Sequence, residues 1–184
     1  MKCSLWAFFN KIYQFYLFLT VLETWNAQYG EENVCFLRYL RLVVEIGTKA
    51  ILRVLEEHVQ NKFQMSFTDF LADNEIANKA VLGGQSKWIK RILYPDSGVF
   101  KTSSLDITTL KTVFAKLPLE FPVPQGQNGW WQKAQDLRQD DVSPAADILR
   151  LADLRNGPLL AHNPRCEIGR QVFEEKWSEA HKIV

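Results

Sequence analysis

The chain has 184 residues, which is enough for one domain with or without a short appendage. Its hydrophobic content of 47% is ample for a core, and its net charge of +1 excludes a global basic field, so any nucleic-acid site must be local. The three cysteines are far apart and form no CxxC or Cys/His cluster, which argues against a zinc site or a disulfide framework.

The first 30 residues are strongly apolar and leave three interpretations open. Apolar residues lie at helical spacing and also fill most of the other faces, and such a helix is either buried or in a membrane. Asn10, Lys11 and Gln14 interrupt the run before it reaches the roughly 18 residues of a membrane span. The segment is therefore a helix docked on the bundle, a signal or membrane anchor, or a start without a fixed fold.

A long helix is expected from about Val34 to Val59, after a polar break at residues 29–33. Glycine in a helix interior costs about 1 kcal/mol relative to alanine, so Gly47 indicates close packing of another helix. The helical period predicts an inward stripe made of Leu37, Leu40, Val44, Ile51 and Leu55.

Three further helices are marked by their capping residues. Ser66 opens the first of them, with Phe67, Phe70, Ala77 and Val81 expected on its buried face. A short helix follows Ser86. Asp106 is the predicted N-cap of the next helix, which Pro118 ends.

Residues 118–141 are rich in proline and glycine and form a long connection. Within it, Trp130 and Trp131 are interpreted either as a cap on the bundle or as a platform for stacking nucleic-acid bases.

Two helices complete the chain. Ser143 caps a helix with Pro144 at its first position, and Gly157-Pro158 is expected to interrupt it. The last helix is predicted from about Cys166 to Ile183, with Ile168, Val172, Phe173, Trp177 and Ala180 buried. Because no segment shows the alternation of a strand, the pattern predicts an all-α bundle of about five main helices.

Arg155, Asn156 and His162 are the candidate site residues. Arginine offers a permanent charge and a planar fork for phosphate oxygens, and histidine a base or acid near neutral pH. On one continuous helix, the spacing of seven between Arg155 and His162 would return to the same face. The alternative is that these residues have no catalytic role, with Arg155 an ordinary solvated arginine and His162 an ordinary histidine in a loop.

The sequence around these residues resembles the C-terminal part of a HEPN domain of the DAZ-interacting zinc-finger protein (DZIP-like) type. The resemblance rests on residues 140–156 with Ala161-His162, and on further pieces in the family's order at 37–53, 88–95, 105–110, 129–130 and 173–177. It covers roughly residues 33–184, which sets the expected domain, with residues 1–30 as an apolar segment of uncertain role.

The resemblance implies a dimeric helical bundle and, in many members, a metal-independent endoribonuclease without a cofactor. Arg155 would bind phosphate and stabilise charge, Asn156 would orient the motif, and His162 would be the acid or base in attack by the ribose 2′-hydroxyl. That chemistry needs RNA rather than DNA. No RING-type Cys/His pattern accompanies the domain, so ubiquitin ligase activity does not carry over. A cytoplasmic location is expected.

Two functions of different classes follow. The first is an RNA-binding domain with metal-independent cleavage in a homodimer. The second is a non-catalytic helical module for dimerisation or protein interaction. They differ in one respect, because a ribonuclease needs Arg155 and His162 exposed towards a shared groove, and a module needs an exposed apolar helix face.

Overall fold

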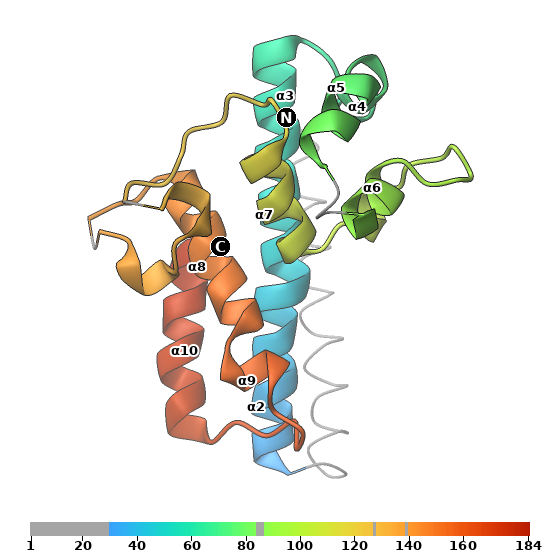
Figure 1. Cartoon of the computed structure of the whole chain (residues 1–184). Coiled ribbons are helices and arrows are strands. Elements are labelled where there is room, and N and C mark those ends of the chain that lie inside the picture. The colour runs from blue at the N-terminus through green and yellow to red at the C-terminus, as the bar shows by residue number, and fades with distance from the viewer. Residues whose placement is uncertain (1–29, 84–86, 127, 139) are drawn as a thin grey trace, which may run out of the picture.

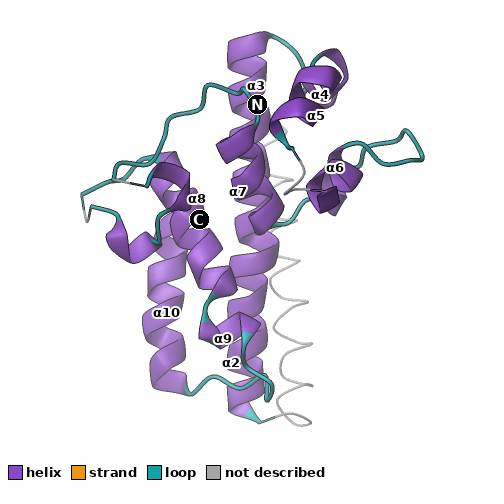
Figure 2. Cartoon of the chain, viewed as in Figure 1, coloured by secondary structure: helices purple, strands orange, loops and turns teal. Residues whose placement is uncertain are grey.

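A computed structural model describes residues 30–83, 87–126, 128–138 and 140–184. Throughout these ranges the regular structure is helical and contains no strand (Figure 2). The long helices lie side by side, and shorter helices lie near both ends of the longest helical stretch (Figure 1). The expected all-α bundle is confirmed, and the described residues form more helices than the five main ones expected.

No helix within the described residues is both long and apolar enough to span a bilayer. The anchor and docked-helix interpretations concern residues 1–29, which lie outside the described ranges.

The longest helical stretch consists of α2 (Glu31–Leu40), η1 (Arg41–Ile46) and α3 (Gly47–Phe63). The three segments run on without a break, because Leu40 and Ile46 at their junctions keep right-handed helical angles. The middle segment is a π-helix, in which each turn holds one residue more than an α-helix allows. Gln64 ends the stretch with a left-handed φ of 58°.

The π-helical turn changes which side chains are buried. The stripe expected in α3 is confirmed, since Ile51 and Leu55 are buried. The stripe expected before it is only partly correct: Leu37, Leu40 and Val44 are half-buried, and Leu37 and Leu40 pack against the edge of the core. Their preceding neighbours Phe36, Tyr39 and Val43 are buried instead. An extra residue in the π turn rotates the two halves relative to each other, so the buried face moves by one residue.

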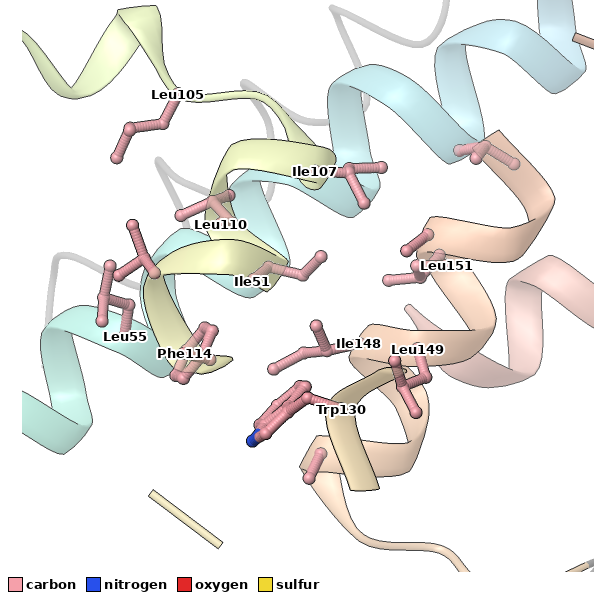
Figure 3. Packing of buried hydrophobic residues seen from close by; sticks show 14 of the residues in the cluster. Ile51, Leu55, Leu105, Ile107, Leu110, Phe114, Trp130, Ile148, Leu149 and Leu151 are labelled. Carbon is pink, nitrogen blue, oxygen red and sulfur yellow. The ribbon is translucent and has the colours of Figure 1, made fainter. Parts of the chain in front are cut away.

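Gly47 lies where two other helices, α7 (Ile107–Lys116) and α8 (Pro144–Asn156), approach the long helix. A Cβ atom at Gly47 would lie 3.3 Å from Cδ2 of Leu151 and 3.6 Å from Cδ1 of Ile107. Figure 3 shows Ile107 and Leu151 near Ile51 in the core. The expected role of Gly47 in close helix packing is confirmed.

The helix expected after Ser66 is divided. It consists of α4 (Phe67–Asp73) and α5 (Glu75–Val81), and α6 (Lys87–Leu93) follows. Asn74 leaves helical geometry at φ −110° and ψ 20°, so α5 begins with a new phase. As a result Ala77 and Val81, which were expected to be buried, are exposed, and Asn78 and Leu82 are buried instead.

Side-chain capping fixes where three helices begin. The expected N-caps Ser66, Asp106 and Ser143 each accept a hydrogen bond from the backbone N–H three residues further on, over 3.1, 2.7 and 3.2 Å. Each bond satisfies one of the N–H groups that a helix start leaves without a partner.

The last helix, α10 (Arg170–Ile183), begins four residues later than expected. Cys166 has a φ of +54°, which is incompatible with a helix. Ile168 is buried as expected, and its N–H donates to the carbonyl of Glu32 over 3.0 Å. The helix then packs along α2. Val172, predicted to be buried, is 42% exposed.

The connection before α8 is held by Asp141, which is only 5% exposed. Its carboxylate accepts the backbone N–H of Ser143 over 3.0 Å and that of Gln125 over 3.2 Å. These bonds, led by those from Ser143, lower the pKa of the Asp141 carboxyl. The carboxylate therefore joins the connection to the start of α8.

Candidate functional site

The end of α8 carries Arg155 and Asn156. Gly157 leaves the helix with an extended ψ of 167°, as the following proline favours. The expected interruption at Gly157-Pro158 is thus confirmed. Arg155 and Asn156 occupy the last turn, where the carbonyl end of the helix dipole favours a positive charge.

The guanidinium of Arg155 is held between two oxygens. Its Nη1 donates to Oδ1 of Asn156 over 2.8 Å, and its Nη2 donates to Oδ2 of Asp106 over 3.3 Å. The side chain remains 38% exposed. Two of five N–H donors are engaged in these bonds, so the fork is fixed in direction and still reachable from solvent.

Asp106 uses its two carboxylate oxygens for different purposes. Oδ1 caps α7 by accepting from the backbone N–H and the hydroxyl of Thr109, over 2.7 and 2.6 Å. Oδ2 accepts from Arg155. One side chain therefore links the start of α7 to the end of α8. Sequence reasoning identified Asp106 as a cap and missed its second role.

His162 lies on a separate short helix, α9 (Pro158–Ala161), as the residue that follows its last turn. The side chain is exposed, and α9 packs against both α8 and α2. Because α8 and α9 are distinct helices, the same-face argument for a spacing of seven does not apply. Among the described residues, no hydrogen bond or ion pair joins His162 to Arg155.

The other two histidines have different surroundings. Nε2 of His58 lies 2.8 Å from the carbonyl oxygen of Leu119, and the ring meets Phe121 edge-on with centroids 4.8 Å apart. This is a packing role between α3 and the connection after α7. His181 is exposed in the last turn of α10. His162 is therefore the histidine nearest in sequence to the end of α8, and its helix α9 packs against α8.

A lysine and an aspartate lie between α7 and α8, beyond the Arg155 pair. Lys111 is half-buried, and burial lowers the pKa of its ammonium group while the nearby Asp153 carboxylate raises it. Oδ2 of Asp153 accepts the backbone N–H of Ala134 over 2.5 Å. This bond fastens the connection after α7 onto α8, two residues before Arg155.

The two adjacent tryptophans have opposite environments. Trp130 is 6% exposed and stacks on Phe114, with ring centroids 5.8 Å apart. Trp131 is 60% exposed, and Nζ of Lys116 lies 5.1 Å from its ring centroid. The bundle-cap interpretation therefore holds for Trp130, and Trp131 presents its ring to solvent.

A shallow cavity of about 410 Å³ lies at the far end of α3, where α4 begins. It is lined by Glu56, Glu57, Gln60, Asn61, Ser66, Phe67, Thr68 and Thr102. Both charged groups in this lining are carboxylates, which repel phosphate. The cavity is thus unsuited to the phosphate chemistry expected of Arg155. Within the described ranges, no group of acidic, histidine and cysteine side chains is arranged to hold a metal ion.

Comparison with known families identifies the part of the chain that contains the candidate site. Residues 68–184 match the model of the DZIP3/hRUL138-like HEPN family. The match extends from α4 to the end of α10 and includes Arg155, Asn156 and His162. No curated protein and no solved structure shows significant similarity to the chain. From the extent of this match, the chain belongs to the DZIP3/hRUL138-like HEPN family.

Proposed function

We propose that this domain binds RNA through Arg155 and cleaves it without a metal ion as a homodimer. The observation that carries the proposal is the guanidinium of Arg155, which is aimed by Asp106 and Asn156 and remains accessible at the end of α8. A planar fork held in this way suits two phosphate oxygens better than a mobile lysine would.

The dimer in this proposal brings the sites of two copies into one cleft. His162 is exposed on its own helix and has no bond to Arg155 within the described chain. Two copies facing each other at α8 and α9 would supply two arginines and two histidines to one phosphodiester. One histidine then acts as base and the other as acid.

The reaction proceeds by attack within the RNA strand. One His162 takes the proton of a ribose 2′-hydroxyl, whose oxygen forms a bond to the adjacent phosphorus. The bond from phosphorus to the 5′-oxygen breaks, and the second copy's His162 protonates that oxygen. Arg155 stabilises the charge that develops on the non-bridging oxygens. The products are a 2′,3′-cyclic phosphate and a 5′-hydroxyl.

The test is cleavage of single-stranded RNA by the purified protein in EDTA, with the product ends identified by mass spectrometry. We expect a 2′,3′-cyclic phosphate from the wild type and no cleavage by His162→Ala, with RNA binding retained. His181→Ala is the matched control and should cleave normally. Cleavage that survives His162→Ala, or that needs Mg²⁺, would refute the mechanism.

Variants of Arg155 separate binding from catalysis. Arg155→Ala should weaken both, because it removes a charged phosphate contact. Arg155→Lys should recover binding more than rate, since lysine lacks the planar fork. Because the proposed mechanism uses His162 from both copies, a mixed dimer of wild-type and His162→Ala chains should be inactive, and mixing the two proteins should lower activity below the share of wild type present.

A non-catalytic dimerisation module is the second candidate. The observation in its favour is the ion pair of Arg155 with Asp106, which gives Arg155 a structural partner in the absence of RNA. A wild-type protein that sediments as a dimer, and neither binds nor cleaves RNA, would establish this function and refute the first.

A further inference from the structure

The exposed ring of Trp131 lies on a firmly anchored turn. The turn, Gly129–Trp131, places the neighbouring ring of Trp130 in the core, where it packs on Phe114 and Phe121. Gly129 has a φ of +50°, and a Cβ atom there would lie 2.9 Å from the side chain of Val123. The backbone under Trp131 is therefore constrained on both sides, and a fixed aromatic surface loses little entropy when a ligand stacks on it.

Positive charge accompanies this ring. Nζ of Lys116 lies 5.1 Å from the ring centroid of Trp131, and the exposed Lys133 follows two residues later. An aromatic face with adjacent lysines is the combination that single-stranded nucleic acid recognises, since bases stack on the ring and phosphates pair with the ammonium groups.

Helix α7 connects this ring to Arg155. Asp106 at the start of α7 contacts Arg155, and Lys116 at the end of α7 contacts Trp131. These ten residues of helix span about 15 Å at 1.5 Å each. A stacked strand that rises about 3.4 Å per nucleotide covers that length with about four nucleotides. Lys111 lies between the two ends.

Two acids lie near this positive charge: Asp106 pairs with Arg155, and Asp153 is close enough to Lys111 to raise the pKa of its ammonium group. Within the described residues, neither Lys116 nor Lys133 is held in an ion pair, and the two are half-buried and exposed respectively.

We propose that Trp131 and Lys116 form a base-stacking site for single-stranded RNA, about four nucleotides from the phosphate held by Arg155. This inference rests on the proposed function and extends it from one phosphate to a strand that runs along α7. Trp131 selects unpaired RNA, because the bases of a duplex have no open face to stack on the ring.

The first test measures binding of a fluorescein-labelled 12-nucleotide single-stranded RNA by anisotropy, with His162→Ala as the background to prevent cleavage. Loss of one stacked base corresponds to a loss of affinity of about 5- to 150-fold. We expect Trp131→Ala to weaken binding within that range and Trp131→Phe to weaken it less. Trp88→Ala is the matched control, since Trp88 is 47% exposed on α6 and should bind as the parent does.

A second test locates the contact on the RNA. A series of the same RNA, each with one abasic nucleotide, should contain a position at which the missing base weakens binding to the parent protein. That penalty should vanish in Trp131→Ala, because base and ring are two halves of one contact.

The outcomes distinguish the stacking site from the proposed function. The parent protein in these tests is His162→Ala. If this parent binds RNA, and adding Arg155→Ala weakens binding but adding Trp131→Ala does not, then the stacking site is wrong and the proposed function stands. If Trp131→Ala and Trp88→Ala weaken binding equally, or if no abasic position couples to Trp131, the stacking site is also wrong. A parent protein that binds no RNA refutes both.

Discussion

Two substitutions separate the two roles of Asp106, which are the cap of α7 and the ion pair with Arg155. Asp106→Asn keeps an oxygen that can cap α7 and removes the negative charge that faces Arg155. Asp106→Ala removes both the cap and the charge. Asparagine and aspartate are about equally good N-caps, so the difference between the two variants reports the cap, and the effect of asparagine alone reports the ion pair.

The structure sets the size of each effect. Loss of an N-cap costs about 0.5–2 kcal/mol. The ion pair is 3.3 Å long, with the two side chains 38% and 43% exposed, so solvent screening limits it to about 0.2–1 kcal/mol. We therefore expect Asp106→Asn to lower the free energy of unfolding by at most about 1 kcal/mol, and Asp106→Ala by about 1–3 kcal/mol.

Urea denaturation followed by circular dichroism measures both values. The cost of Asp106→Asn should shrink in 1 M salt and should disappear in an Arg155→Gln background, where no charge remains to pair. The reasoning is refuted if both Asp106 variants cost the same, or if the cost of Asp106→Asn persists without Arg155.

Three further predictions concern the fold. Gly47→Ala should change the free energy of unfolding by less than about 1 kcal/mol, because the gain in helix propensity offsets the 3.3 Å contact with Leu151. Gly47→Leu should lower the free energy of unfolding by about 1–3 kcal/mol, because the larger side chain overpacks the core. Urea titrations should show that Leu151→Ala reduces the penalty of Gly47→Leu. The pKa of Asp141 is lowered in the folded state, so its stabilisation is present above the ordinary value of 3.8 and is lost as the pH falls through the lowered pKa. Asp141→Asn should therefore destabilise the protein at pH 7, and the difference in unfolding free energy between wild type and variant should narrow below pH 3.8. A difference that stays the same at low pH would contradict this explanation. Deletion of residues 1–30 should leave a cooperative thermal transition in residues 33–184, and a non-cooperative transition would place the deleted segment in the core.

The sequence predicted helices and their caps better than it predicted buried faces. Caps depend on a few adjacent residues, which explains why Ser66, Asp106 and Ser143 were identified from the sequence. A buried face depends on an unbroken period, and the period fails at the π turn of Arg41–Ile46 and again at Asn74. Asn74 has no proline or glycine beside it, and Gly47, which directly follows the π turn, indicated only close packing, so periodicity carried through both points placed the most buried side chains one residue off.

The candidate site was predicted where it depends on neighbouring residues. Arg155 and Asn156 are adjacent, and the proline at position 158 marks the end of α8. The partner of Arg155 could not be predicted, because Asp106 is 49 residues away and its short side chain was already explained by the cap. Spacing likewise gave no warning that Trp130 and Trp131 would point into different environments, since only the tertiary packing decides which ring is covered.

The extended backbone at Gly157 has a consequence for how local disorder affects the site. Arg155 is tied to α7 through Asp106, and His162 follows α9, which packs against both α8 and α2. The separation of the two side chains therefore depends on the contacts that α2 and α7 each make with the rest of the bundle. A sub-global opening, in which one of these helices loosens and the others stay folded, would separate arginine from histidine with most of the helical structure intact. In the proposed mechanism, RNA cleavage would then be confined to the fully closed bundle.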